Sequence, residues 1–234
     1  MKKMKKIGAA ILAACMVVSM AACGNSATTG DNGSQSESSS NSGKTDIVIA
    51  VDADIDTLHP ANFSTTVELN ILNQIYDTLM YMNPDETHDP EPRIAESYEI
   101  SDDGLDYTFH LRDDVTFHDG SKLTSEDVKF SLEMYQQSEY QGYEVDGLAS
   151  VDTPDDTTVV CHLEYPYSPF LLGVCNVHIA SKSYYEASAD NFVSSPVGTG
   201  PYKYVGRNKG SDITLEAYDG YSVSYTHLTL PTIA

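Results

Sequence analysis

The chain has 234 residues, with 13 basic and 35 acidic side chains, so its formal net charge at pH 7 is −22. This acidity argues against nucleic acid and against an anionic membrane surface as partners. It is compatible with an exported domain that favours cationic or zwitterionic ligands, although acidity for solubility alone explains it equally well.

The N-terminal segment has the pattern of a bacterial export signal. Four lysines precede an apolar run over residues 7–20, which is too short to span a membrane comfortably. Small residues then lead to Cys23, and this arrangement resembles a lipobox. We therefore expect residues 1–22 to be removed and Cys23 to be lipidated; an ordinary cleaved signal that happens to contain a cysteine is the alternative. Loss of the four lysines leaves nine basic against 35 acidic residues, a formal charge of −26.

A low-complexity segment follows the signal. Residues 23–45 are mostly Ser, Gly, Asn and Thr, without an aromatic or large aliphatic residue. Such a segment cannot bury apolar surface, so we expect a disordered tether. A folded domain is expected to begin at residue 46 and to continue to residue 221.

The first part of that domain alternates buried and polar segments. Residues 47–51, Ile-Val-Ile-Ala-Val, form a β-branched run that predicts a buried strand. The polar loop over residues 52–60 follows it, a place where α/β binding proteins put ligand contacts. Apolar residues at helical spacing predict a helix over residues 67–79. Residues 82–92 are rich in Pro, Asp and Glu and are expected to form an exposed loop.

A hairpin and a capped helix are predicted next. Residues 96–100 and 107–111 flank a turn that contains Asp-Gly, which is typical of a β-hairpin. A further short strand is expected at residues 115–118. Thr124 then suits the N-cap of an amphipathic helix. The buried face of that helix is expected to hold Val128, Leu132 and Tyr135.

The remaining elements are mostly strands. A second hairpin is predicted from residues 145–151 and 157–163, and Pro169 suits the first turn of a short helix. In the Gly-rich motif at residues 196–202, two glycines permit backbone conformations denied to other residues. The motif lacks the Gly-Lys-Ser/Thr ending of a phosphate loop. Two strands are expected after it, at residues 202–205 and 213–217.

No residue pattern indicates catalysis. The seven histidines are dispersed without the spacing of metal ligands, and no G-x-S-x-G motif marks a serine nucleophile. His118 and Asp119 invite a metal or acid/base interpretation, but they lie at a strand-to-turn junction. We expect no catalytic residue, no metal site and no cofactor. Cys161 and Cys175 lie in apolar contexts that favour buried free thiols, although export would permit a disulfide.

The stretch from Arg93 to Tyr135 resembles the signature region of family 5 extracellular solute-binding proteins of ABC importers. Further matches are Y-D-x-L at residues 76–79, P-x-x-P-F-L at 166–171 and P-V-G-T-G-P-Y at 196–202. The resemblance covers about residues 46–221. It implies an α/β fold, a two-lobe clamp of the type II periplasmic-binding-protein kind. The chain would supply only the early part of the first lobe and its side subdomain.

The resemblance also implies a function. The protein would be the lipid-anchored substrate-binding component of an ABC importer. It would be a monomer and would not be an enzyme. It would capture a peptide or a similar small solute and deliver it to transmembrane permease subunits. The implied ligand contacts are backbone groups of Asp54, Ile55 and Asp56, which would bind a peptide like an added β-strand. Relatives also bind nickel chelates or oligosaccharides; a surface lipoprotein that senses or adheres without transport is the alternative.

The last residues depart from the family pattern. Residues 222–234 resemble one reading frame of a sequencing adapter, so we expect an assembly artefact; a genuine divergent C-terminus is the alternative. Because family 5 proteins are much longer, we also expect the second lobe to be missing. With it would go the acidic residue that meets the N-terminal amine of a bound peptide.

Overall fold

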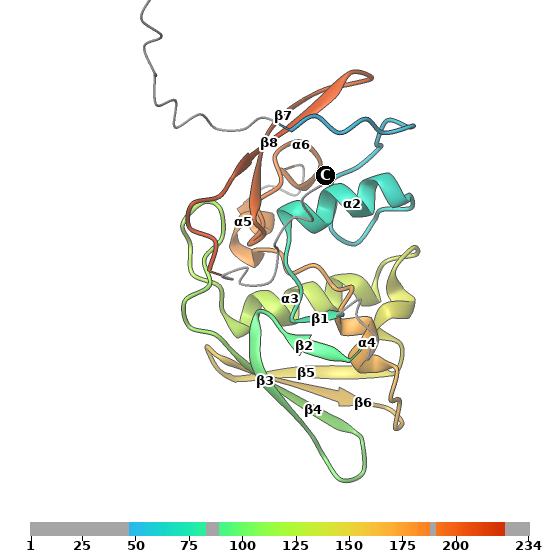
Figure 1. The fold of residues 1–234 in the computed structure, drawn as a ribbon. Helices are drawn as coiled ribbons and strands as arrows, with labels where there is room; N and C mark the ends of the chain where they lie inside the picture. The colour runs from blue at the N-terminus through green and yellow to red at the C-terminus, as the bar shows by residue number, and fades with distance from the viewer. Residues whose placement is uncertain (1–46, 83–88, 188–190, 223–234) are drawn as a thin grey trace, which may run out of the picture. The chain divides into compact units, whose positions relative to one another are not determined.

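Three antiparallel sheets and a set of short helices make up the fold (Figure 1). The structure is a computed structural model that describes residues 47–82, 89–187 and 191–222. The elements all belong to the unit that begins at Ile49. The predicted signal, tether and lipidated Cys23, and all of the predicted tail except Ser222, lie outside the described residues. Within the described ranges, no helix is long and apolar enough to cross a membrane.

The largest sheet has four strands in the order β3-β4-β6-β5. Both predicted hairpins are confirmed, since β3 pairs with β4 and β5 with β6. The second hairpin begins later than predicted because Val145 ends a short 3-10 helix, η2, over Gly142–Val145. The strands are β3 (Ala95–Ile100), β4 (Asp106–Leu111), β5 (Leu148–Asp155) and β6 (Thr158–Leu163).

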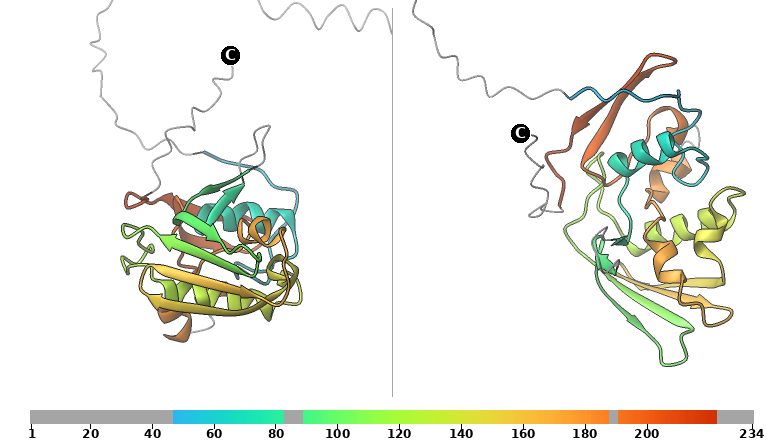
Figure 2. Two further views of the ribbon diagram at one scale, coloured as in Figure 1. Left: turned by 90° about the horizontal axis from the view of Figure 1, so that it is seen from below. Right: turned by 45° about the vertical axis from the view of Figure 1, so that its right-hand side comes forward.

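Helix α3 (Ser125–Gln136) packs against this sheet (Figure 2). Its start is fixed as predicted at Thr124, whose backbone N–H and hydroxyl both donate to Oδ2 of Asp127, at 2.9 and 3.0 Å. This carboxylate also suits the positive end of the helix. The predicted face is confirmed, because Val128, Leu132 and Tyr135 are fully buried.

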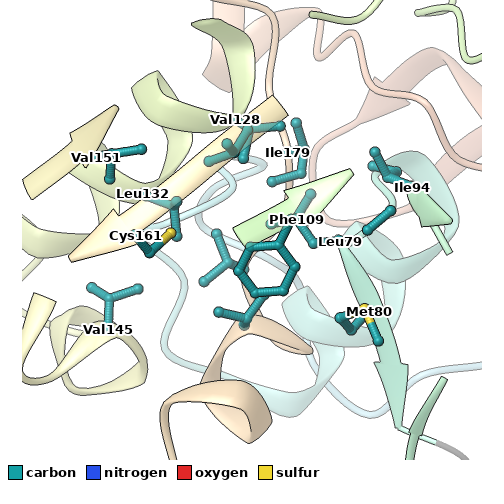
Figure 3. Close-up of a cluster of buried hydrophobic side chains, with 14 of the residues drawn as sticks. Leu79, Met80, Ile94, Phe109, Val128, Leu132, Val145, Val151, Cys161 and Ile179 are labelled. Atoms are coloured by element: carbon teal, nitrogen blue, oxygen red, sulfur yellow. The ribbon is translucent and has the colours of Figure 1, made fainter. Parts of the chain in front are cut away.

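The first hydrophobic core lies between α3 and the sheet. Figure 3 shows Phe109 of β4 at its centre, close to side chains from α3 and β6. Helix α4 (Phe170–Val174) contributes Phe170, whose ring meets that of Tyr107 edge-on at 5.1 Å. Pro169 caps this helix with φ of −66°, the value that proline imposes, so its predicted place is confirmed.

A second core joins helix α2 to the last hairpin. Helix α2 (Thr66–Ile75) packs against β7 (Tyr202–Asn208), which pairs with β8 (Asp212–Ala217), as predicted. The short helices α5 (Lys182–Ala187) and α6 (Asn191–Ser194) lie beside each other in this part. Buried members of the core include Ile55, Leu58, Leu72, Ile75, Tyr76 and Phe192.

The predicted helix over residues 67–79 ends early. Tyr76 is extended, with φ of −115° and ψ of 146°, and its N–H still caps the helix by donating to Leu72. The chain then enters β1 (Met80–Met82), which pairs with β2 (Pro90–Pro92). Part of the loop predicted at 82–92 is therefore a strand. Its prolines are tolerated because β2 is an edge strand, in which not every residue has to donate an N–H hydrogen bond to a neighbouring strand.

Two predicted strands are wrong. Residues 47–51 form no strand, and Ile47, Val48 and Ile49 are 70–94% exposed. No described segment hydrogen-bonds alongside them, and β-branched residues form a strand only beside a neighbour. Residues 115–118 make one bridge, Thr116 to Lys122, because the chain turns back directly after Phe117 at Gly120, whose φ is 85°.

The glycines of the motif at 196–202 serve another purpose than predicted. Neither Gly198 nor Gly200 adopts a positive φ. A Cβ at Gly198 would lie 2.1 Å from the carbonyl oxygen of Ile75, and one at Gly200 would lie 2.6 Å from that of Gln74. Glycine is required here because the motif presses directly against the end of α2.

The predicted thiols are confirmed. Cys161 and Cys175 are both buried and free. Burial raises the pKa of the Cys175 thiol to about 11, and it raises that of Cys161 further, so both remain protonated.

Candidate ligand-binding site

The three predicted ligand contacts lie together in the loop before α2. Ile55 is 2% exposed and belongs to the second core, whereas Asp54 and Asp56 face solvent. The buried side chain in the middle anchors the loop, so the acidic residues on either side are held at the surface. The structure thus brings the predicted residues together, although no strand precedes them.

Glu68 holds this loop through a set of backbone hydrogen bonds. One oxygen of its carboxylate accepts the N–H groups of Asp56 and Thr57, at 2.9 and 3.1 Å. The other oxygen accepts those of Ser64 and Thr65, at 2.9 and 3.0 Å. Both ends of the segment that leads into α2 are therefore fixed by one side chain, which is itself 1% exposed.

The environment keeps this carboxyl group ionised. Burial alone would raise the pKa of Glu68, but the four N–H donors outweigh burial and hold the pKa below its ordinary value. Glu68 also occupies the third position of α2, where the Thr65 hydroxyl accepts its N–H at 3.2 Å. This reciprocal arrangement is a capping box, and the N-terminal end of the helix further favours the negative charge.

The β7–β8 hairpin holds the other side of the loop. Arg207 on β7 donates to Oδ1 of Asp54 at 2.9 Å and also to the carbonyl oxygen of Ile55. The N–H of Gly210, in the hairpin turn, donates to Oδ2 of Asp54 at 2.9 Å. Desolvation would raise the pKa of Asp54, but Arg207 and these N–H donors lower it below its ordinary value.

Several backbone groups of the predicted site already have partners. The N–H of Ile55 donates to the Asp54 side chain at 2.9 Å, its carbonyl accepts from Arg207, and the N–H of Asp56 donates to Glu68. A ligand that adds to this loop like a β-strand must therefore use other groups or displace these bonds. Sequence reasoning missed both Glu68 and Arg207. The Thr-x-x-Glu spacing at residues 65–68 was a signal for the first; no local pattern marks the second.

Two of the histidines that the structure describes, His118 and His178, serve structural roles. The Nδ1 atom of His118 accepts the N–H of Gly198 at 3.3 Å, and its Nε2 bonds the carbonyl of Gly200 at 2.9 Å. His118 thus fastens the glycine motif and has no ring nitrogen left for a metal. Among residues 47–82, 89–187 and 191–222, no group of three or more metal-ligating side chains occurs.

His178 is the most deeply buried of these rings. Its Nδ1 lies 3.0 Å from the hydroxyl of Tyr135, and its Nε2 lies 2.9 Å from Oδ1 of Asn73. Burial lowers the pKa of His178 to about 4, so the ring is neutral at pH 7. Because Asn73 lies on α2 and Tyr135 on α3, His178 links the helices of the two cores.

The Y-D-x-L motif also packs inside the protein. Tyr76, Asp77 and Leu79 are at most 1% exposed. Asp77 pairs with Arg93, whose Nε lies 2.7 Å from Oδ1. Burial raises the pKa of Asp77 to about 6 although Arg93 opposes the shift. The motif is therefore buried and serves packing.

Comparison with known families identifies the fold. A family model described as bacterial extracellular solute-binding proteins, family 5 Middle, matches residues 89–230. The chain belongs to this family. Family 5 proteins are extracytoplasmic solute-binding proteins and not enzymes.

Two curated relatives illustrate the similarity. The chain is 30% identical to heme-binding protein A of Haemophilus influenzae, over 92% of the chain and 44% of that protein. It is 32% identical to the dipeptide-binding protein of Escherichia coli, over 56% of the chain and 29% of that protein. The chain therefore spans less than half the length of these relatives.

Solved structures share the fold. The oligopeptide-binding protein AppA of Bacillus subtilis, in complex with a nonapeptide, matches with a TM-score of 0.65 at 28% identity. NikZ of Campylobacter jejuni, in complex with Ni(L-His), matches with a TM-score of 0.66 at 28% identity. The matches cover 72% and 74% of the chain, and 35% and 36% of the two structures. The fold of this chain is thus part of a type II periplasmic-binding-protein fold.

Proposed function

We propose that this family 5 chain belongs to the substrate-binding component of an ABC importer, anchored to the membrane by a lipid on Cys23. It captures peptides or similar small solutes outside the cytoplasm and delivers them to permease subunits. The observation that carries this proposal is the family match over residues 89–230, together with fold similarity to peptide-bound relatives.

Capture uses the loop of Asp54, Ile55 and Asp56 as one wall of the ligand site. Glu68 and Arg207 hold this loop in one conformation before ligand arrives, which lowers the entropy lost on binding. Ligand contacts that form only in a closed state of the complete clamp shift its population toward closure.

A peptide is the favoured solute class. Asp54 is occupied by Arg207 and Gly210, whereas the exposed carboxylate of Asp56 can attract a ligand that carries an ammonium group, and peptides carry one at the N-terminus. The proteins of similar sequence are named for heme, dipeptides and glutathione, two of which are peptides. Structural relatives were solved with a nonapeptide and with the peptide STSA.

Isothermal titration calorimetry on the protein encoded by the complete gene tests this proposal. Blocked and free di- to pentapeptides without Lys or Arg serve as ligands, and we expect binding of the free peptides only. Asp56→Ala should weaken binding by about tenfold if the loop contacts the ammonium group. Asp102→Ala, in the exposed hairpin turn, is the matched control and should change nothing. Peptide binding that is unaltered by Asp56→Ala contradicts the attraction of the ammonium group by this carboxylate, since the variant keeps the backbone contacts of the loop.

Two further measurements separate anchoring and transport from binding. A Cys23→Ala variant should move from the membrane fraction to the soluble fraction, while retention at the membrane contradicts lipidation. Uptake of labelled peptide by cells should require the gene. Peptide binding without any dependence of uptake on the gene would favour a sensor or adhesin over a transport component.

A further inference from the structure

One long stretch of the chain has no basic residue. Between Lys129 and Lys182 the sequence contains no Lys or Arg but eight Asp and Glu residues. This stretch runs from α3 through η2, β5 and β6 to α4, so one side of the first core is built from it. Its surface attracts cations and repels nucleic acid and anionic lipid.

Large apolar side chains are exposed on the same stretch. Tyr140 is 55% exposed, Tyr143 is 66% exposed and Tyr165 is 43% exposed. Elsewhere in the described residues, the large apolar side chains that are more than half exposed are all aliphatic: Ile47, Val48, Ile49, Val51 and Val205. Tyrosine presents a large ring at low entropy cost, and for this reason it is enriched where proteins meet.

The tyrosines and carboxylates occupy one region. Helix α4 packs against η2 so closely that a Cβ on Gly173 would lie 1.8 Å from the carbonyl oxygen of Glu144. Directly after η2, Asp146 accepts the hydroxyl of Tyr165 at 3.2 Å. The Tyr165 ring in turn covers Gly147, since a Cβ added to this glycine would lie 3.3 Å from the ring. Tyr143 and Tyr165 therefore flank the segment of residues 144–147.

The carboxylates of this region have no cationic partner among the described residues. Glu139, Asp146 and Glu164 are exposed and Glu144 is half-buried. In the described part of the chain, none of the four pairs with Lys, Arg or His. Glu144 accepts from the amide of Asn176 at 3.0 Å and also interacts with the hydroxyl of Tyr143. The region thus combines aromatic faces with negative charges that remain available to a ligand.

We propose that this surface, defined by Tyr143, Tyr165, Glu144, Asp146 and Glu164, docks a basic segment of a partner protein. Lys or Arg side chains would lay their methylene groups across the tyrosine rings and place their cations over the rings and against the carboxylates. Complementary charge favours a basic polypeptide over an apolar helix, because Glu144 lies beside Tyr143, and Asp146 and Glu164 lie beside Tyr165, and an apolar partner would leave these carboxylates unpaired. The proposal does not depend on the solute site at Asp54–Asp56.

Titration of the 234-residue chain with a blocked basic peptide, acetyl-Lys-Leu-Lys-Arg-amide, tests the proposal. The blocked ends keep the probe from acting as a free peptide solute. Nuclear magnetic resonance should show saturable shifts of the ring signals of Tyr143 and Tyr165, assigned by Tyr→Phe substitution. Tyr143→Ala and Tyr165→Ala should each weaken binding about two- to fivefold, which is the worth of one exposed cation–π contact. Tyr202→Ala, at a similarly exposed ring on β7, should leave the affinity unchanged.

Charge and ligand class are tested in parallel. Raising salt from about 50 to about 300 mM should weaken binding severalfold, since exposed charges are screened. Acetyl-Glu-Leu-Glu-Glu-amide should not bind. Equal affinity of the wild-type chain and the double Tyr→Ala variant would overturn the proposal. It would also be overturned if an N-acetylglucosamine tetramer, and not the basic peptide, moved the two ring signals.

Discussion

Replacing Glu68 with Gln should destabilise the fold more than any other single loss of charge near the candidate site. The glutamine keeps one acceptor oxygen, but its NH₂ group cannot accept a hydrogen bond. Two of the four backbone N–H donors then face another donor. A buried donor left without an acceptor costs about 1–3 kcal/mol, which gives about 2–6 kcal/mol for the pair. Because water can reach part of the loop, we expect the lower half of that range.

Urea unfolding followed by circular dichroism measures this change. Glu133→Gln, at an exposed position of α3, is the matched control and should alter the free energy of unfolding by less than about 0.5 kcal/mol. A loss below about 1 kcal/mol for Glu68→Gln would refute the view that the carboxylate organises the loop.

The pH dependence gives an independent check on Glu68. Its pKa is lower in the folded protein than the ordinary value of 4.5. The unfolded state therefore binds a proton first, so this stabilisation is complete above pH 4.5 and is lost as pH falls through the folded pKa. The difference in stability between the wild-type chain and Glu68→Gln should shrink in acid, and a constant difference would contradict the assignment.

Three other predictions follow from the buried groups. The pKa of His178 falls from 6.5 to about 4 on folding, so stability should fall by about 3 kcal/mol between pH 6.5 and 4; His178→Gln should abolish this contribution in urea titrations. Gly198→Ala should cost about 2–4 kcal/mol because its Cβ would strike backbone, whereas Gly206→Ala, with open space, should be nearly neutral; equal midpoints would contradict the packing argument. Cys161 and Cys175 should react with a thiol reagent only after unfolding, and rapid labelling of the native chain would show that they are accessible.

Local sequence patterns were enough to predict an element where its hydrogen-bonding partners lie close to it in the sequence. The hairpins β3–β4 and β5–β6, and the two strands β7 and β8, were predicted because each pair of runs flanks a short turn in the sequence. Helix α3 was predicted because its N-cap residue and its apolar face both lie within 14 consecutive residues, Thr124 to Gln137.

Prediction failed where the partner lies elsewhere in the chain. Residues 47–51 have the composition of a buried strand, but composition does not supply a neighbouring strand. Prolines at 90 and 92 indicated a loop, yet β2 pairs with β1, with Met80 opposite Pro92 and Met82 opposite Pro90. The close contact of Gly198 with Ile75 is likewise a property of packing, since the two residues are 123 positions apart.

The sequence by itself determined the family, because the ordered motifs between residues 76 and 202 are local strings of residues. It also located Asp54, Ile55 and Asp56 in one polar loop. Only the tertiary structure decided how that loop is held, through Glu68 on one side and Arg207 on the other. Hydrogen bonds of this kind join residues that are distant in the chain, so the acceptor of a given backbone N–H cannot be identified from the local sequence.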